Sequence, residues 1–142
     1  EAFLAHPAVA LCAVVGEPDA HAGEVPVAFV TLKPGAAITP EALLAEVAPH
    51  VYERPATPKR VTVIDTMPVT AVGKIYKPAL RLRAIETRFA ELLADVEGAS
   101  VHAEERGAVL AAVVTLPDAT DAQALRDRLA AIAVEVEFRA AD

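Results

Sequence analysis

The most informative stretch of this sequence is Met67-Pro-Val-Thr-Ala-Val-Gly-Lys-Ile-Tyr-Lys-Pro-Ala-Leu-Arg81. It places Gly73 and Lys74 in a loop between an expected strand and an expected helix. Glycine permits a tight backbone path and the lysine ammonium is a movable point charge, so the combination indicates contact with a phosphate group. The segment is not a P-loop, because Pro68 stands where that motif has its first glycine and Ile75 stands where it has Ser or Thr for magnesium.

Three apolar or alternating stretches upstream of this segment are expected to be strands, because they are rich in valine and bounded by turn residues: 8–15, 25–33 and 60–65. Gly16-Glu-Pro-Asp19 is expected to be the turn that ends the first of these strands. Thr39 as N-cap and Pro40 in the first helical position predict a helix that runs until Pro49.

The strongest helical pattern lies downstream. Pro78 opens it, and its apolar residues recur at spacings of three, four and seven until Gly98. The sequence then predicts two strands joined by a turn at Arg106-Gly107, a helix with a capping pattern at Thr120, and a final strand. The expected ranges are 100–104 and 108–116 for the two strands, 120–132 for the helix and 134–138 for the last strand.

These elements predict an α+β fold. Residues 1–96 are expected to form a small mixed sheet of about three strands with flanking helices, and residues 97–142 a small strand-strand-helix-strand appendage. Because so short an appendage buries little apolar area alone, we expect it to pack on residues 1–96 or on a domain outside this sequence. Residues 1–6 resemble the end of a helix stopped by Pro7, which indicates a fragment of a longer chain.

The charge is unevenly distributed. The formal net charge is −7, yet eight Lys or Arg and only two acidic residues lie between Arg54 and Arg88. An acidic chain with one basic region is poorly suited to nucleic-acid binding. The basic region is expected to face a small anionic ligand or an acidic partner, or to be a solvated helix face.

Other residues restrict the possible functions. Cys12 is the only cysteine, so no disulfide forms within the chain, and no apolar run is long enough for a transmembrane helix. A cytoplasmic protein is expected. The four histidines lack metal-ligand spacing, so no metal site is predicted.

Eight residues of the central stretch match the run Pro-x-Thr-x-x-Gly-Lys-Ile, then a basic residue, then Leu-Arg: Pro68, Thr70, Gly73, Lys74, Ile75, Lys77, Leu80 and Arg81. Upstream pieces agree in order and spacing: His6-Pro-Ala-Val9, Val14-Val-Gly-Glu-Pro-Asp19, Gly23-Glu24, Ala28-Phe-Val30, Leu32-Lys-Pro-Gly35 and Thr39-Pro-Glu-Ala-Leu43. Over about residues 1–95 the chain thus resembles the mobile C-terminal domain of the AMP-forming acyl-CoA synthetases, of the adenylate-forming superfamily. Residues 97–142 look like the extension of a bacterial subset.

The resemblance implies an acid–thiol ligase of fatty-acid metabolism. In such an enzyme a carboxylate attacks the α-phosphate of ATP to form an acyl-adenylate, and the CoA thiol then displaces AMP. ATP, Mg and the acid are implied to bind mainly to an N-terminal adenylation domain of the same chain, which this sequence lacks. The fragment alone is therefore expected to be inactive.

The resemblance also implies the roles of individual residues. Lys74 is the implied catalytic residue, which bridges the carboxylate and the α-phosphate, while Pro68, Thr70 and Gly73 shape its loop. After a swing of the domain, four residues are implied to form a face on the CoA side: Gly16, Glu17, Pro18 and Asp19.

Two further expectations concern cations. Lys77 and Arg81 are candidates for phosphate contacts, although a helix surface that only favours solubility explains them equally well. The family is commonly regulated by protein lysine acetyltransferases, and the spacing from Pro68 to Lys74 resembles their target motif. Acylation of Lys74 would remove its charge.

Two alternatives from other function classes stay open. Residues 97–142 could belong to a non-catalytic ligand-binding or regulatory module, and the basic helix could belong to a protein-interaction domain. Neither alternative explains why Pro68, Thr70, Gly73 and Lys74 occur together.

Overall fold

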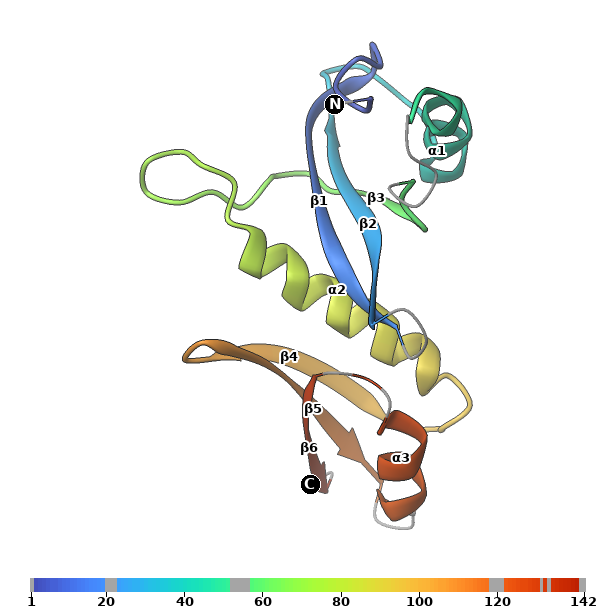
Figure 1. Cartoon of the computed structure of the whole chain (residues 1–142), viewed down its shortest axis with the longest axis vertical. Helices are drawn as coiled ribbons and strands as arrows, with labels where there is room; N and C mark the ends of the chain where they lie inside the picture. Colours follow the sequence, from blue (N-terminus) through green and yellow to red (C-terminus); the bar gives the residue numbers. More distant parts are fainter. Residues whose placement is uncertain are drawn as a thin grey trace. The chain divides into compact units, whose positions relative to one another are not determined.

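The structure is a computed structural model that describes residues 2–19, 23–51, 57–117, 122–130, 132 and 134–140. It contains two compact units (Figure 1). The first comprises Glu1–Gly16 with Val25–Leu80, and the second comprises Glu17–Glu24 with Arg81–Asp142. The division falls inside a helix at Leu80, so the domain boundary expected at residue 96 stays a prediction.

The first unit is built on a three-stranded sheet in the order β1-β2-β3. β1 (Val9–Asp19) and β2 (Gly23–Leu32) are adjacent and follow each other too closely for parallel strands, so they form an antiparallel hairpin. β3 (Val61–Val63) pairs in parallel with β2. The crossover contains α1 (Pro40–Val47) and a single 3₁₀ turn, η1 (Ala48–His50).

Local chemistry explains where α1 begins. Thr39 has extended backbone geometry and its Oγ1 accepts a hydrogen bond from the Ala42 amide at 3.1 Å, while Pro40 occupies the first helical position. Leu43 and Val47, one turn apart, point into the core of the first unit. The other buried members of that core are Phe3, Val9, Ala28, Val30 and Val61.

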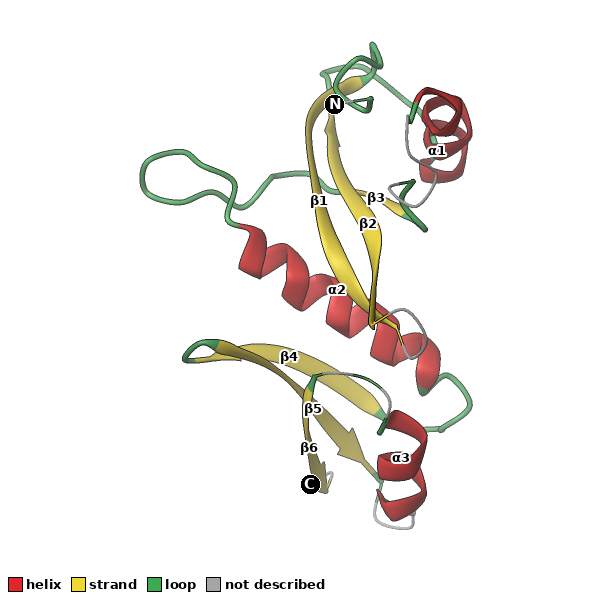
Figure 2. Cartoon of the chain, in the orientation of Figure 1, coloured by secondary structure: helices red, strands yellow, loops and turns green. Residues whose placement is uncertain are grey.

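The second unit contains most of α2 (Lys77–Leu92) and a second three-stranded sheet in the order β4-β5-β6 (Figure 2). β4 (Ser100–Arg106) is antiparallel to β5 (Val109–Leu116), and β6 (Glu135–Ala140) is parallel to β5. α3 (Ala122–Leu129) lies in the connection between β5 and β6. The buried core comprises Ile85, Phe89, Leu93, Ala103, Ala112, Val114, Leu116, Leu125, Leu129 and Ile132.

The predicted α+β class is confirmed, with a small three-stranded mixed sheet in the first unit and the expected strand-strand-helix-strand order after α2. The turn expected at Gly16–Asp19 is wrong, because these residues are the end of β1. The adjacent strand β2 supplies backbone partners across the hairpin, and this pairing overrides the local turn preference of glycine and proline. α3 ends at Leu129 rather than at the expected residue 132. Its predicted cap, Thr120, lies outside the described residues.

Candidate functional site

The Gly-Lys segment forms a small hairpin in the first unit, where it leads from β3 into α2 (Figure 1). Val69 and Ile75 form an isolated antiparallel bridge. Within it the Thr70 amide donates to the Lys74 carbonyl at 2.7 Å, and the Gly73 amide donates to the Thr70 carbonyl at 2.9 Å. This pattern is a three-residue loop closed by the Thr70–Lys74 pair.

Gly73 is required by the conformation of this loop. Its φ is +84°, in the left-handed region, where a residue with a Cβ is strained. No atom lies within 4 Å of the place where a Cβ would stand. The need for glycine therefore comes from the backbone angle and not from a shortage of space.

Thr70 and Pro68 hold the hairpin closed. The Lys74 amide donates to Thr70 Oγ1 at 3.2 Å, so the Thr70 hydroxyl adds a contact to the backbone pair. The Pro68 carbonyl accepts a hydrogen bond from the Tyr76 amide at 2.9 Å. The structure thus brings together Pro68, Thr70, Gly73 and Lys74, the four residues singled out in the sequence.

Lys74 is presented outward from this closed loop. Its side chain is exposed, and no described residue forms an ion pair with its ammonium group. Two apolar side chains of the same hairpin are also exposed: Val69 is 55% exposed and Val72, at the loop tip, is 81% exposed. An exposed apolar tip next to the exposed Lys74 is the surface expected of a loop that inserts into a partner.

The two candidate phosphate ligands lie on α2. Lys77 and Arg81 are four residues apart, which places them on neighbouring turns of one helix face, and both are exposed. Their exposure is compatible with an anionic ligand and equally with a solvated surface.

The segment proposed for the CoA side is mostly enclosed in the second unit. Glu17 has no exposed surface and Pro18 is buried, while Gly16 and Asp19 are half-buried. Asp19 Oδ1 lies 3.8 Å from Nη2 of Arg88 on α2. Of the four residues, only Gly16 and Asp19 offer surface to a ligand in this arrangement.

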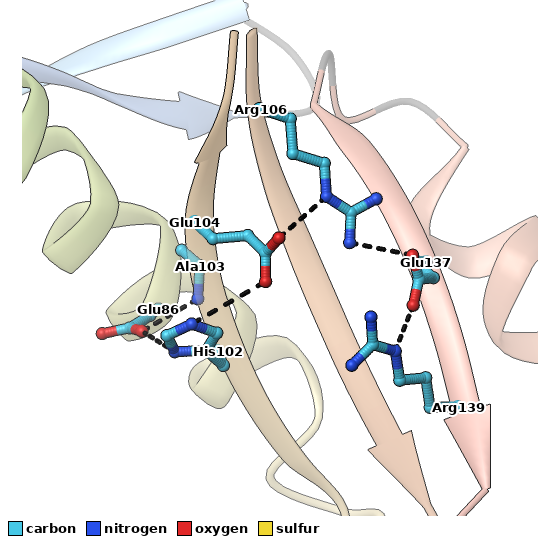
Figure 3. Close-up of polar contacts among 7 residues, drawn as sticks. All are labelled: Glu86, His102, Ala103, Glu104, Arg106, Glu137 and Arg139. Carbon is cyan, nitrogen blue, oxygen red and sulfur yellow. Dashed lines mark hydrogen bonds and ion pairs between the residues drawn. The ribbon is translucent and has the colours of Figure 1, made fainter.

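A second polar cluster lies on the sheet of the second unit (Figure 3). Arg106 donates from Nε to Glu104 and lies 2.8 Å from Glu137 through Nη2, so it links β4 to β6 across β5. Arg139 also pairs with Glu137. Hydrogen bonds that Arg139 first and Arg106 second donate to it lower the pKa of the Glu137 carboxyl, and the hydrogen bonds that Arg106 donates to Glu104 and Glu137 raise the pKa of Arg106.

The sequence analysis did not single out this cluster. Its only signal is the alternation of charges along 102–106 and 135–139, which indicates exposed strand faces but not a cross-sheet network. Every named charge has an opposite partner, so the cluster is arranged for stabilising a sheet surface rather than for chemistry. At the edge of β4, Glu86 accepts a hydrogen bond from the Ala103 amide at 2.8 Å, which blocks addition of another strand there (Figure 3).

Three other features bear on the possible chemistry. Burial raises the pKa of the Cys12 thiol, which disfavours the nucleophilic thiolate. Among the described residues, no three His, Cys, Asp or Glu side chains form a group that could hold a metal ion. No helix in the described part of the chain has the length and apolar character needed to span a membrane.

An α+β unit that displays the exposed Lys74 ammonium group on a closed hairpin is suited to supplying a positive charge to an anionic site elsewhere. The family model described as the AMP-binding enzyme C-terminal domain matches residues 1–74, just over half of the chain. The chain belongs to this family. The match ends at Lys74, so it includes the loop residues from Thr70 to Lys74.

Known relatives agree with this assignment. The chain is 46% identical over 84 residues to an acetyl-coenzyme A synthetase of Pyrobaculum arsenaticum, covering 56% of this chain and 12% of the relative. It is 44% identical over 84 residues to a medium/long-chain-fatty-acid–CoA ligase of Mycobacterium tuberculosis, covering 55% and 15%. An acyl-CoA synthetase structure from Brucella canis matches with a TM-score of 0.55 and 41% identity, covering 61% of this chain and 16% of that chain.

The chain therefore spans about one seventh of the length of these relatives. The greater part of each relative has no counterpart in this sequence.

Proposed function

We propose that this chain is the lid of an AMP-forming acid–CoA ligase and that Lys74 is its catalytic residue for adenylation. The amino-terminal adenylation domain of the same protein would supply the binding sites for ATP, Mg and the acid. The single observation that carries the proposal is the exposed Lys74 ammonium on a closed hairpin within the matched family domain.

The chemistry of adenylation needs such a cation. A carboxylate oxygen attacks the α-phosphorus of ATP, a new P–O bond forms, and the bond to the pyrophosphate oxygen breaks. Both reactants are anions, so an ammonium group that contacts the carboxylate and an α-phosphate oxygen offsets their repulsion and stabilises the transition state. The hairpin fixes the Lys74 backbone through Thr70, which limits the conformational freedom lost when the side chain binds.

The second half-reaction does not need this cation. The CoA sulfur attacks the acyl carbonyl carbon, the C–O bond to AMP breaks, and the thiol proton goes to solvent. We propose that the lid presents a different face in this step, at Gly16, Glu17, Pro18 and Asp19, with Lys77 and Arg81 as contacts for CoA phosphates. The exposed positions of Lys77 and Arg81 support this part of the proposal, whereas the burial of Glu17 and Pro18 restricts the face to Gly16 and Asp19.

The acid is proposed only as a class, a carboxylic acid of the fatty-acyl type. The two relatives above are almost equally similar to this chain, yet their names specify acetate and medium- or long-chain fatty acids. The lid sequence therefore carries little information about the acid, because the acyl pocket belongs to the other domain.

Lys74 is also proposed as a substrate of a protein lysine acetyltransferase. An exposed lysine at the closing position of a hairpin is accessible to a second enzyme, and acetylation would remove the charge that adenylation uses. Such modification would switch off the first half-reaction and spare the second.

The test uses the full-length protein and measures the two half-reactions separately. For the Lys74→Ala variant we expect acid-dependent exchange of pyrophosphate into ATP to fall by at least about a hundredfold, in line with the loss of one transition-state charge contact. Conversion of supplied acyl-adenylate to the thioester should persist. Lys33→Ala is the matched control, since Lys33 is also an exposed lysine of the first unit. Normal exchange by Lys74→Ala, or equal loss of both half-reactions, would overturn the proposal.

A further inference from the structure

The sheet of the second unit has an open edge at β6. This strand pairs in parallel with β5 on one side, and among the described residues no strand pairs with its other side. Every second residue of such an edge strand directs its backbone N–H and C=O groups away from the sheet. The edge of β6 therefore offers hydrogen-bonding groups to one more strand.

The two edges of this sheet differ. β6 contains no proline and no lysine, and its pairing with β5 runs without a bulge through all six of its residues. These are features that commonly protect an edge from pairing with another chain. At the opposite edge, the Ala103 amide of β4 donates to the Glu86 carboxylate at 2.8 Å (Figure 3). Of the two edges, that of β6 is thus the more open to pairing.

The charged side chains of β6 form a row on one face of the sheet. Strand geometry places Glu135, Glu137 and Arg139 on this face. Arg106 holds the row in place, because its Nη2 lies 2.8 Å from Glu137 and its Nη1 lies 3.9 Å from Glu135. Arg139 pairs with Glu137 as well (Figure 3). Side chains that are already held lose little conformational freedom when a partner binds.

The other face of β6 is apolar. Val136 and Phe138 are half-buried and pack against the core of the second unit. The guanidinium group of Arg126 on α3 lies 5.0 Å from the centre of the Phe138 ring. An added strand would cover the part of Val136 and Phe138 that solvent still reaches, which is a favourable burial of apolar surface.

We propose that the edge of β6 is a self-association surface, where β6 of a second copy of this chain pairs antiparallel and the two sheets become one sheet of six strands. Identical chains associate most often about a two-fold axis. When this axis is perpendicular to the sheet, each residue faces a residue of the same sheet face only if the axis passes through a residue position of β6.

An axis at Phe138 gives the register in which opposite charges meet. It places Glu137 opposite Arg139 of the second copy on one side of the axis, and Arg139 opposite Glu137 of that copy on the other side. The two Phe138 rings face each other on the apolar side, where cross-strand aromatic pairs are favourable. An axis at Glu137 would instead bring two carboxylates together.

The order of the charges also identifies the occupant as a second copy. Glu137-Phe-Arg139 is complementary to its own sequence when the two copies run antiparallel. A strand from another protein would need a basic residue opposite Glu137 and an acidic residue opposite Arg139. A second copy of β6 supplies both by symmetry.

The test measures self-association of the full-length protein by sedimentation over a range of concentrations, together with amide hydrogen exchange in residues 135–140. Wild type is expected to dimerise as its concentration rises, and the outward amides of β6 should then exchange at least about tenfold more slowly. Arg139→Glu should raise the dissociation constant of the dimer at least about tenfold, because both attractive pairs become repulsive. Arg128→Glu is the matched control and should leave the dimer intact, since Arg128 is also a surface arginine of this unit, 2.9 Å from Asp95.

A charge exchange tests the register. Glu137→Arg should also weaken self-association, because the new side chain faces Arg139 of the second copy. An equimolar mixture of Arg139→Glu and Glu137→Arg should restore the dimer, because each variant supplies the charges that the other lacks. Glu137 also pairs with Arg106, so Glu137→Arg could fail to fold. The comparison of Arg139→Glu with Arg128→Glu decides the question in that case.

Other results would overturn the proposal. A protein that stays monomeric up to about 1 mM, with unchanged exchange in β6, would show that no second copy binds there. Slow exchange in β6 at every concentration would assign the edge to another part of the same protein. A dimer that Arg139→Glu leaves intact would place the contact elsewhere. None of these outcomes depends on ligase activity, so the role proposed for Lys74 is unaffected.

Discussion

The hydroxyl group of Thr70 offers the sharpest test of whether the hairpin positions Lys74 for adenylation. Thr70 Oγ1 accepts a hydrogen bond from the Lys74 amide at 3.2 Å, while the Thr70 amide donates to the Lys74 carbonyl at 2.7 Å. Thr70→Val keeps the shape and the backbone pair and removes only the acceptor. The perturbation is therefore confined to one contact that closes the loop.

The expected decrease in adenylation follows from the loss of that single hydrogen bond. One hydrogen bond contributes about 0.5–1.5 kcal/mol net, which corresponds to a roughly two- to twelvefold change in the population of the closed loop. Adenylation should fall by this factor in the full-length Thr70→Val protein, and thioester formation from supplied acyl-adenylate should be unchanged. The melting temperature should hardly move, because the hairpin lies outside the buried core of the first unit.

The assay is acid-dependent pyrophosphate exchange, run beside the thioester half-reaction. Thr70→Ser retains a hydroxyl and should restore most of the exchange rate. Thr66→Val is the matched control, because Thr66 is an exposed threonine that precedes the hairpin. Exchange at the wild-type rate in Thr70→Val, or a parallel drop in the thioester step, would refute the assignment of Thr70 as a positioning residue.

Three further predictions address stability and backbone geometry. Gly73→Ala should reduce adenylation because a φ of +84° costs a residue with a Cβ about 1–2 kcal/mol, and pyrophosphate exchange at the wild-type rate would contradict this. Leu125→Ala should destabilise the second unit by about 2–5 kcal/mol, measured by chemical denaturation, because its side chain is buried in that core. The pKa of Glu137 is lowered by Arg139 and Arg106, so its contribution to stability is present above a pH of about 4.5 and is lost as the pH falls further. The melting temperatures of wild type and Glu137→Gln should therefore converge in acid, and added salt should narrow their difference at neutral pH because the paired side chains are partly exposed to solvent.

Elements with local signals were predicted well from the sequence. The start of α1 depends on Thr39 and Pro40, which act within one turn, and the predicted helix begins at the expected residue. The Gly-Lys loop is equally local, since every hydrogen bond that closes it joins residues between Pro68 and Tyr76. Such features can be inferred from a short stretch of chain because all their contacts lie within it.

Features that depend on distant residues were not predicted. The segment from Gly16 to Asp19 carries turn residues, but its pairing with β2 makes it a strand. The network around Glu137 joins β4 to β6, and β5 and α3 lie between these strands in the sequence. No local sequence pattern therefore predicts it.

The sequence by itself determined the α+β class and the family, and it singled out Lys74 as the candidate residue, because short-range hydrogen bonds, backbone preferences and the spacing of a few residues encode these features. Only the tertiary structure decided the order and register of the two sheets and the burial of Glu17 and Pro18. These depend on strand pairing and side-chain burial between residues far apart in the chain, and the free energy of such contacts exists only once the chain has folded.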